Sequence, residues 1–376
     1  MEPDTQLSSV ASALAGSDGA PGAGPEPLRG RRIGGALSPL LRWETGLVVV
    51  LIGVVIFGLD TSSAFTSASY LFSQVLGGQV GEIAMMTLPM TLIIITGEID
   101  LSVASTAGMA SSLMGYLFMH HWSIALIFVT VLAMGAVAGA FNGFLVTRVG
   151  LPSLAVTIGT LTLYRGIAIG ILGANTYSTF PTFWTNIGVN PVPGLPFMSW
   201  AFLIFLVMAA LVGIVLHMTP LGRTLFAIGA NREAAQFAGI RVKRTKFMLY
   251  TFSGVVCAFV GILLTFRLNT AVSNNAYGLE LTVVATALLG GISIFGGKGT
   301  IVGVLLANLV FAGIEGALYL TTGFNESAFP IVTSGLLLAS VLIPNFPELR
   351  RRAREAMHRR RRLHGAAPSV EQGVSR

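Results

Sequence analysis

Two carboxylates, Glu98 and Asp100, lie in a short polar segment between two long apolar runs. An ionisable group in such a place is costly inside a bilayer unless it faces water, a protein partner or a solute pathway. Gly97 permits a break in the chain, and Asp100 or Ser102 can cap the helix that follows. The segment is therefore either a capped cytoplasmic turn or a polar element beside a translocation pathway.

A second segment, residues 220–246, predicts a short helix in the largest cytoplasmic loop. Asn231 is a good N-cap, and Gly239 suits the position after the last helical residue. Such a helix has about two turns and is not stable alone, so it must dock on something. Its surface could dock on the cytoplasmic end of the same protein or in a groove on a partner. The side chains that offer this surface are Arg232, Ala234, Ala235, Gln236 and Ala238.

A third segment, residues 280–300, is an apolar run that ends in a glycine-dense turn. It imitates a phosphate-binding loop, but that loop requires Ser or Thr directly after Gly-Lys, and here Gly299 follows Lys298. Close helix packing and a sharp turn explain these glycines better. The sequence shows no other ATP-binding motif, no nucleophile elbow and no metal-binding His pair. If transport needs energy, a separate chain or a gradient must supply it.

The composition indicates that lipid surrounds most of the chain. Of 376 residues, 53% are hydrophobic and 10% are charged, and the mean hydropathy is +0.77. Ordinary soluble domains have about 25% charged residues. The apolar runs are long and continuous rather than alternating, which predicts helices and excludes an outer-membrane barrel. The fold class is therefore an all-α polytopic membrane protein.

The charges predict how the helices cross the membrane. With the N-terminus inside, all 23 Lys and Arg except Arg165 and Arg267 fall in cytoplasmic segments, as the positive-inside rule requires. This favours an even number of spans with both termini in the cytoplasm. We expect about ten spans, over residues 46–60, 78–96, 101–119, 123–146, 153–173, 200–217, 247–267, 279–295, 300–320 and 328–344.

Three regions follow from this pattern. Residues 1–42 form a disordered tail with a basic collar, residues 43–346 form the transmembrane domain with a cytoplasmic loop over 217–246, and residues 347–376 form a basic cytoplasmic tail. The formal charge of +7 does not indicate nucleic-acid binding, because the basic residues lie between apolar runs. The single cysteine, Cys257, excludes an internal disulfide, and we expect neither a metal nor a cofactor.

Two rival functions use other residues. A gradient-driven carrier would use intramembrane ionisable groups, for which the candidates are Glu82, Asp100, Arg165, Arg267, Glu280 and Glu315. A membrane-embedded enzyme would use His120 and His121 as metal ligands. Adjacent residues on a helix point apart, which argues against the second rival.

The three segments, taken together, resemble the monosaccharide permeases of ATP-binding-cassette (ABC) importers. The resemblance covers about residues 40–345. It rests on Gly97–Ser105, Gly222–Ile240 and Glu280–Thr300, which stand in the family's order and spacing. The permeases of the ribose, xylose, rhamnose and autoinducer systems belong to this family. Glu98 departs from the family's pattern, since many members have a second glycine at this position. Glu98 and the segment Arg42-Trp43-Glu44 look most like the rhamnose branch of the family.

The resemblance implies an ABC importer permease fold in the bacterial inner membrane, without enzymatic activity of its own. It implies an ABC ATPase inside, a periplasmic or lipid-anchored sugar-binding protein outside, and a second permease, identical or paralogous, within the membrane lipid. It further implies a coupling segment for the ATPase, made of Gly222, Arg223, Gly229, Asn231, Arg232, Ala234, Ala235, Ala238 and Gly239. The expected pathway residues are Glu98, Asp100, Ser102, Ser105, Glu280, Gly290 and Gly291.

Overall fold

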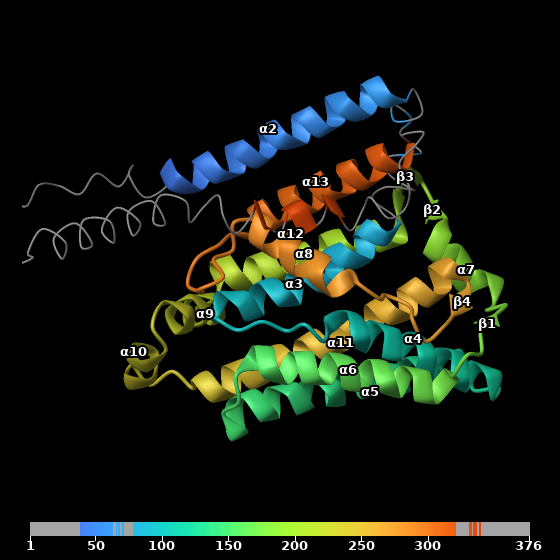
Figure 1. Cartoon of the computed structure of the whole chain (residues 1–376), viewed down its shortest axis with the longest axis horizontal. Helices are drawn as coiled ribbons and strands as arrows, with labels where there is room; N and C mark the ends of the chain where they lie inside the picture. The colour runs from blue at the N-terminus through green and yellow to red at the C-terminus, as the bar shows by residue number, and fades with distance from the viewer. Residues whose placement is uncertain are drawn as a thin grey trace, which may run out of the picture. The chain divides into compact units, whose positions relative to one another are not determined.

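Every expected span up to residue 320 corresponds to a helix in the computed structural model, which describes residues 38–62, 65, 67, 70, 78–320, 331–332, 334–336 and 338–339 (Figure 1). The last expected span, 328–344, falls only partly within these residues, and those described there are mostly helical. The helices are α2 (Ser38–Thr61), α3 (Gln79–Ile95), α4 (Val103–Met119), α5 (Ile124–Phe144), α6 (Ser153–Leu172), α8 (Trp200–Met218), α11 (Val242–Leu268), α12 (Leu279–Leu289) and α13 (Ile301–Leu320).

Six helices of the described chain are long and apolar enough to cross a bilayer, namely α2, α5, α6, α8, α11 and α13. The apolar helices α3, α4 and α12 are shorter, with 17, 17 and 11 residues. Left-handed glycines explain two of these short lengths. Gly97, with φ of 78°, follows α3, and Gly291, with φ of 85°, follows α12, which therefore stops well before the expected end at residue 295.

Helix α11 lies in the middle of the bundle and packs on α5, α4 and α3 (Figure 1). Its contact with α5 is a backbone approach at Gly254, where an added Cβ would lie 2.1 Å from the carbonyl oxygen of Gly135. Small residues allow such approaches between membrane helices, which gain no hydrophobic driving force from lipid. Two thirds of the most apolar stretch of α11 is consequently buried, against 11% for α2.

The connection between α6 and α8 folds into short elements rather than an open loop. It contains β1 (Tyr177–Ser178), α7 (Thr182–Val189), β2 (Pro191–Val192) and β3 (Leu195–Ser199). Strand β1 pairs with β4 (Thr270–Ala271) just after α11, and β2 pairs with β3. Trp184 of α7 stacks on Phe266 of α11 with ring centroids 5.6 Å apart. The connection is thus fixed to the end of α11.

The expected tails over 1–42 and 347–376 lie outside the described residues, except that residues 38–42 already belong to α2. The chain divides into a unit that ends at Leu41 and a unit that begins at Arg42. All contacts described below lie within the second unit.

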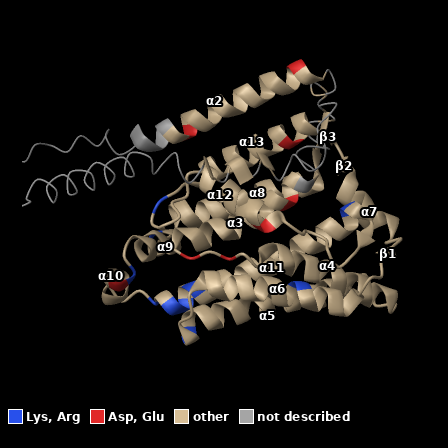
Figure 2. Cartoon of the chain, in the orientation of Figure 1, with Lys and Arg blue, Asp and Glu red and all other residues tan. Residues whose placement is uncertain are grey.

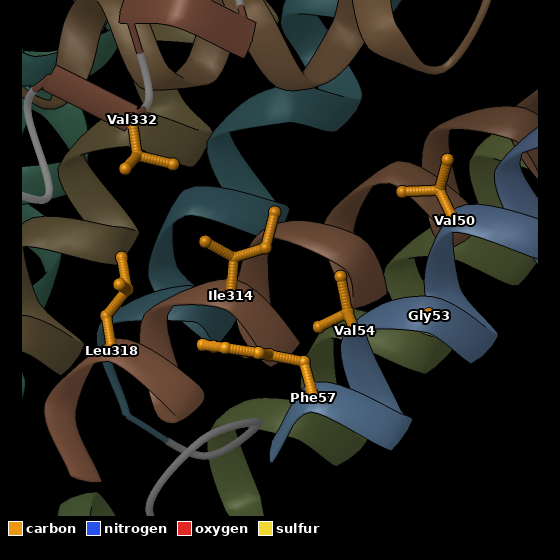
Figure 3. Close-up of a pocket in the computed structure, with 7 residues that line it drawn as sticks. All are labelled: Val50, Gly53, Val54, Phe57, Ile314, Leu318 and Val332. Carbon is orange, nitrogen blue, oxygen red and sulfur yellow. The ribbon is translucent and has the colours of Figure 1, made fainter. Parts of the chain in front are cut away.

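An apolar pocket lies between α2 and α13 (Figure 3). Its lining offers no polar side chain that could bind a sugar, so we do not assign it to the solute. The residues around it are Val50, Gly53, Val54, Phe57, Ile314, Leu318 and Val332.

Candidate functional site

The segment 220–246, expected to carry one short helix, contains two, α9 (Pro220–Ala230) and α10 (Arg232–Phe237). The Asn231 side chain caps α10, because its Oδ1 accepts a hydrogen bond of 3.0 Å from the amide of Ala234. Gly239, with φ of 82°, ends the turn after α10. The cap and the terminating glycine are therefore where the sequence predicts them.

Helix α10 docks on the same chain through one residue and exposes the rest. Ala235 is 4% exposed and packs with Ile228 of α9 and Val242 of α11. Phe237, which the sequence analysis did not single out, is 92% exposed. Phe237 therefore leaves its whole ring uncovered by its own chain, and aromatic side chains are enriched among the anchors of protein interfaces. The other exposed residues of this surface are Arg232, Glu233, Ala234, Gln236 and Ala238.

Gly229 of α9 brings the three sequence segments into backbone contact. A Cβ added at Gly229 would lie 1.9 Å from the carbonyl oxygen of Ile95 and 2.3 Å from the amide nitrogen of Gly297. That amide donates a hydrogen bond of 2.8 Å to the same carbonyl. A Cβ at Gly296 would lie 2.9 Å from the amide nitrogen of Gly97. We call these four glycines, Gly97, Gly229, Gly296 and Gly297, the glycine junction.

The loop between α12 and α13 also contacts the start of α2. The indole of Trp43 donates a hydrogen bond of 3.0 Å to the carbonyl of Leu289, and Thr300 donates one of 2.8 Å to Glu44. Gly290 is buried against α13, and Gly291 lies beneath Trp43. These two glycines, expected beside the pathway, therefore make helix contacts in this structure.

The chain is non-helical from Thr96 to Ser102, with turns at Thr96–Gly97 and Leu101–Ser102, before α4 begins, and Asp100 fixes this break. Asp100 is 2% exposed and accepts hydrogen bonds from the amide of Ser102 at 3.0 Å, from the hydroxyl of Ser102 at 2.6 Å and from the hydroxyl of Ser253 at 3.1 Å. Buried polar groups are costly unless partnered, and these bonds supply the partners. Asp100 thereby joins the break to α11.

The network around Asp100 continues to α5 and α6. Asn142 donates a hydrogen bond of 2.8 Å to the Ser102 hydroxyl, and the Tyr164 hydroxyl lies 3.3 Å from the Asn142 oxygen. The Ser105 hydroxyl donates to the carbonyl of Ser102 at 2.9 Å and is itself buried. Asp100, Ser102 and Ser105 are thus enclosed by helices of the same chain. A fully satisfied network of this kind makes the local conformation specific.

A buried ion pair connects the α3–α4 break to the first turns of α11, which follow α10. Lys246, in the first turns of α11, lies 2.5 Å from Glu98, and their side chains are 6% and 14% exposed. Breaking a buried pair leaves an uncompensated charge and costs about 3–5 kcal/mol. Glu98 therefore stabilises the position of α11 directly after α10. The sequence placed Lys246 among the basic residues of the cytoplasmic loop without indicating this partner.

The charges of the described chain are unevenly placed along the bundle (Figure 2). Lys and Arg gather around α9, α10 and the adjoining ends of α5 and α11. At the far end of α11, Arg267 makes two hydrogen bonds to the buried carboxylate of Glu82, at 2.8 and 3.0 Å. Two of the ionisable groups that a carrier could use therefore neutralise each other.

The histidines proposed as metal ligands for an enzyme do not form a cluster. The Nδ1 of His120 lies 2.8 Å from the carbonyl oxygen of Tyr116. Within the part of the chain that the structure describes, no group of three His, Cys, Asp or Glu side chains could hold a metal ion.

Comparison with known proteins agrees with this architecture. A family model described as the permease component of the branched-chain amino acid transport system matches residues 71–341. The chain therefore belongs to this permease family. Membership of the family and six apolar helices of membrane-spanning length make it a multi-pass protein of the bacterial inner membrane.

Individual relatives are import permeases. The chain is 31% identical over 308 residues to the autoinducer 2 import system permease protein LsrD of Yersinia enterocolitica, covering 80% of this chain and 91% of that protein. It is 30% identical over 332 residues to LsrD of Salmonella paratyphi B, covering 86% and 98%. LsrC of Salmonella choleraesuis is 29% identical over 303 residues, covering 80% and 84%. No solved structure matches the chain.

Proposed function

We propose that this chain is the membrane-spanning subunit of an ABC importer and forms the pathway for a sugar-like solute by alternating access. The observation that carries the proposal is the surface of α10, which exposes Phe237 yet is anchored through Ala235 and α9 to the glycine junction. A force applied to this surface by a partner would reach the α3–α4 break through backbone contacts. ATP is hydrolysed by a separate ATPase chain, and the permease itself carries out no covalent chemistry.

The residues of the coupling segment divide into two roles. Arg223, Arg232, Ala234 and Ala238 are exposed and would touch the ATPase beside Phe237. Gly222, Gly229 and Ala235 would position this surface, because they contact their own chain: a Cβ at Gly222 would lie 1.9 Å from the carbonyl oxygen of Leu216. Asn231 and Gly239 would hold the ends of α10. Asp100, Ser102 and Ser105 would line the pathway only in a conformation that opens the network around them.

The proposal extends to the membrane topology, the partners and the solute of the importer. We propose ten spans with both termini in the cytoplasm, which places α10 and its basic surroundings on the side where ATP is available. A solute-binding protein would dock on the opposite side, and a second permease chain would complete the pathway. A sugar-like solute related to autoinducer 2 is favoured over rhamnose, because the relatives LsrC and LsrD belong to autoinducer 2 import systems.

Changing Phe237 to Glu should abolish binding of the partner ATPase while leaving the permease folded. An exposed aromatic anchor at the centre of an interface contributes about 2–4 kcal/mol, so we expect at least a thirtyfold weaker association. The association is measured by surface capture of the ATPase on purified permease in nanodiscs. Phe183→Glu is the matched control, since Phe183 is 67% exposed but lies in α7. Equal loss in both variants would contradict the role of α10.

Reconstituted vesicles separate the importer from a gradient-driven carrier. The permease is inserted with its ATPase and binding protein, and uptake of autoinducer 2, D-ribose and L-rhamnose is followed with and without ATP. We expect uptake of a sugar-like solute that needs both partners and ATP. Uptake by the permease alone under a proton gradient would overturn the proposal. The Glu82–Arg267 pair makes that outcome unexpected, because neither charge is free to bind a coupling ion.

A further inference from the structure

A half-buried arginine on α6 lies inside a membrane-spanning helix, in the half of the bundle away from α10. Arg165 donates hydrogen bonds from Nη1 to the carbonyl oxygens of Ser273 at 3.1 Å and Asn275 at 2.9 Å. Its guanidinium also lies against Gly108 of α4, where an added Cβ would come within 2.5 Å of Nη1. The same Cβ would lie 2.6 Å from the carbonyl oxygen of Asn275, so a larger residue at position 108 would also press on the loop that Arg165 holds.

The loop that Arg165 contacts presents an aromatic side chain beside it. Asn275 fixes the loop, because its Nδ2 donates hydrogen bonds to the Ser111 hydroxyl at 2.8 Å and to the carbonyl of Thr270 at 3.1 Å. Ala276 then adopts a left-handed φ of 60°, which a residue with a Cβ rarely does. Tyr277 follows, 75% exposed, with its ring centroid 5.4 Å from the Arg165 guanidinium carbon. Strained backbone held by well-placed contacts is a mark of functional sites.

An acid completes the group. Glu280, three residues after Tyr277 in the first turn of α12, is half-buried and lies within electrostatic range of the Arg165 guanidinium without forming an ion pair with it. Among the described residues, Nε and Nη2 of Arg165 donate no hydrogen bond, since both of its bonds come from Nη1. A charge at the centre of a span costs about 2.5 kcal/mol or more unless it is partnered or meets water, and the two carbonyls partner Nη1 alone.

We propose that Arg165, Tyr277 and Glu280 form a subsite that binds the neighbouring hydroxyl groups of a sugar-like solute as it crosses the membrane. This inference rests on the proposed function and names where the solute is touched. Guanidinium N–H groups donate to one hydroxyl, the carboxylate accepts from the next, and the tyrosine ring covers the apolar C–H face. A few convergent polar groups beside an aromatic surface are the usual composition of a small-molecule site. An amino acid such as leucine lacks the paired hydroxyls.

A cysteine reporter tests the subsite without altering its members. Asn274 is exposed next to the loop residues, and the native Cys257 is 0% exposed, so Asn274→Cys gives one reactive thiol. The rate of labelling by a charged maleimide is measured in the reconstituted importer with autoinducer 2, D-ribose, L-rhamnose or leucine. We expect the sugar that is taken up to slow labelling at least threefold, and leucine to have no effect. Phe183→Cys should label at the same rate throughout.

Two further variants make the result specific. In the Asn274→Cys background, Tyr277→Ala or Glu280→Gln should remove the protection and lower the uptake rate at least tenfold, while capture of the ATPase is unchanged. If a sugar is taken up with ATP but leaves labelling unchanged, the subsite is wrong and the importer stands. If none of the three sugars is taken up with ATP, the proposed function itself fails.

Discussion

Changing Gly229 to Ala should abolish coupled uptake. The new Cβ would lie 1.9 Å from the carbonyl oxygen of Ile95 and 2.3 Å from the amide nitrogen of Gly297, and both are backbone atoms that cannot rotate away. Either α9 moves outward or the hydrogen bond from the Gly297 amide to the Ile95 carbonyl breaks. Forced overpacking costs about 1–3 kcal/mol, and the displaced α9 carries α10 with it. We expect uptake to fall at least tenfold, measured in vesicles with the full set of partners.

Gly213→Ala is the matched control for this prediction. Gly213 also lies inside a helix, α8, but the nearest atom to its added Cβ is a side-chain carbon of Ile301 at 3.8 Å. Alanine is favoured over glycine in a helix by about 1 kcal/mol, so this variant should be neutral or slightly stabilised. If Gly229→Ala supports the same uptake as Gly213→Ala, the glycine junction does not transmit motion.

Removing either member of the Glu98–Lys246 pair should destabilise the protein strongly. Each single change, Glu98→Met or Lys246→Met, leaves a buried charge without a partner and costs about 3–5 kcal/mol. We expect the Tm of the purified protein in detergent to fall by about 5–15 °C. Intrinsic tryptophan fluorescence during a thermal scan measures it.

The double variant decides what the pair does. Replacing both charges by methionine removes the unpaired charge, so the Tm should recover most of the loss, as it does when buried pairs become apolar. Lys243→Met is the control, since Lys243 is exposed on the same helix and exposed charges contribute about 0–1 kcal/mol. Additive losses in the double variant would show that the two side chains do not interact.

The sequence predicted those features that depend on local chemistry. Apolar runs located the helices up to residue 320, because lipid requires each span to satisfy its own backbone. Asn231 and Gly239 located α10, because a cap and a left-handed glycine act on adjacent residues. The end of a helix was predicted less accurately where glycines accumulate. The apolar run predicted a span to residue 295, but α12 ends at Leu289.

Contacts between distant parts of the chain were not predictable from a single sequence. The partner of Glu98 lies 148 residues away, and nothing in the residue types distinguishes Lys246 from the exposed Lys243 beside it. A glycine shows that a close backbone approach is possible but not which backbone approaches it. The contact of Gly229 with Ile95 was therefore not predictable from the sequence. The residue type of Phe237 favours a core position, and only its 92% exposure in the structure places it on the surface.

Solute-stimulated ATP hydrolysis is the most direct test of the claim that α10 couples this permease to an ATPase. The ATPase is assayed in vesicles with the permease and the loaded binding protein, using the wild-type chain and Phe237→Glu in parallel. The account predicts that solute raises the hydrolysis rate with the wild-type chain and leaves it unchanged with Phe237→Glu. If adding the solute leaves the ATP hydrolysis rate unchanged while the wild-type chain still transports the solute, the account is contradicted.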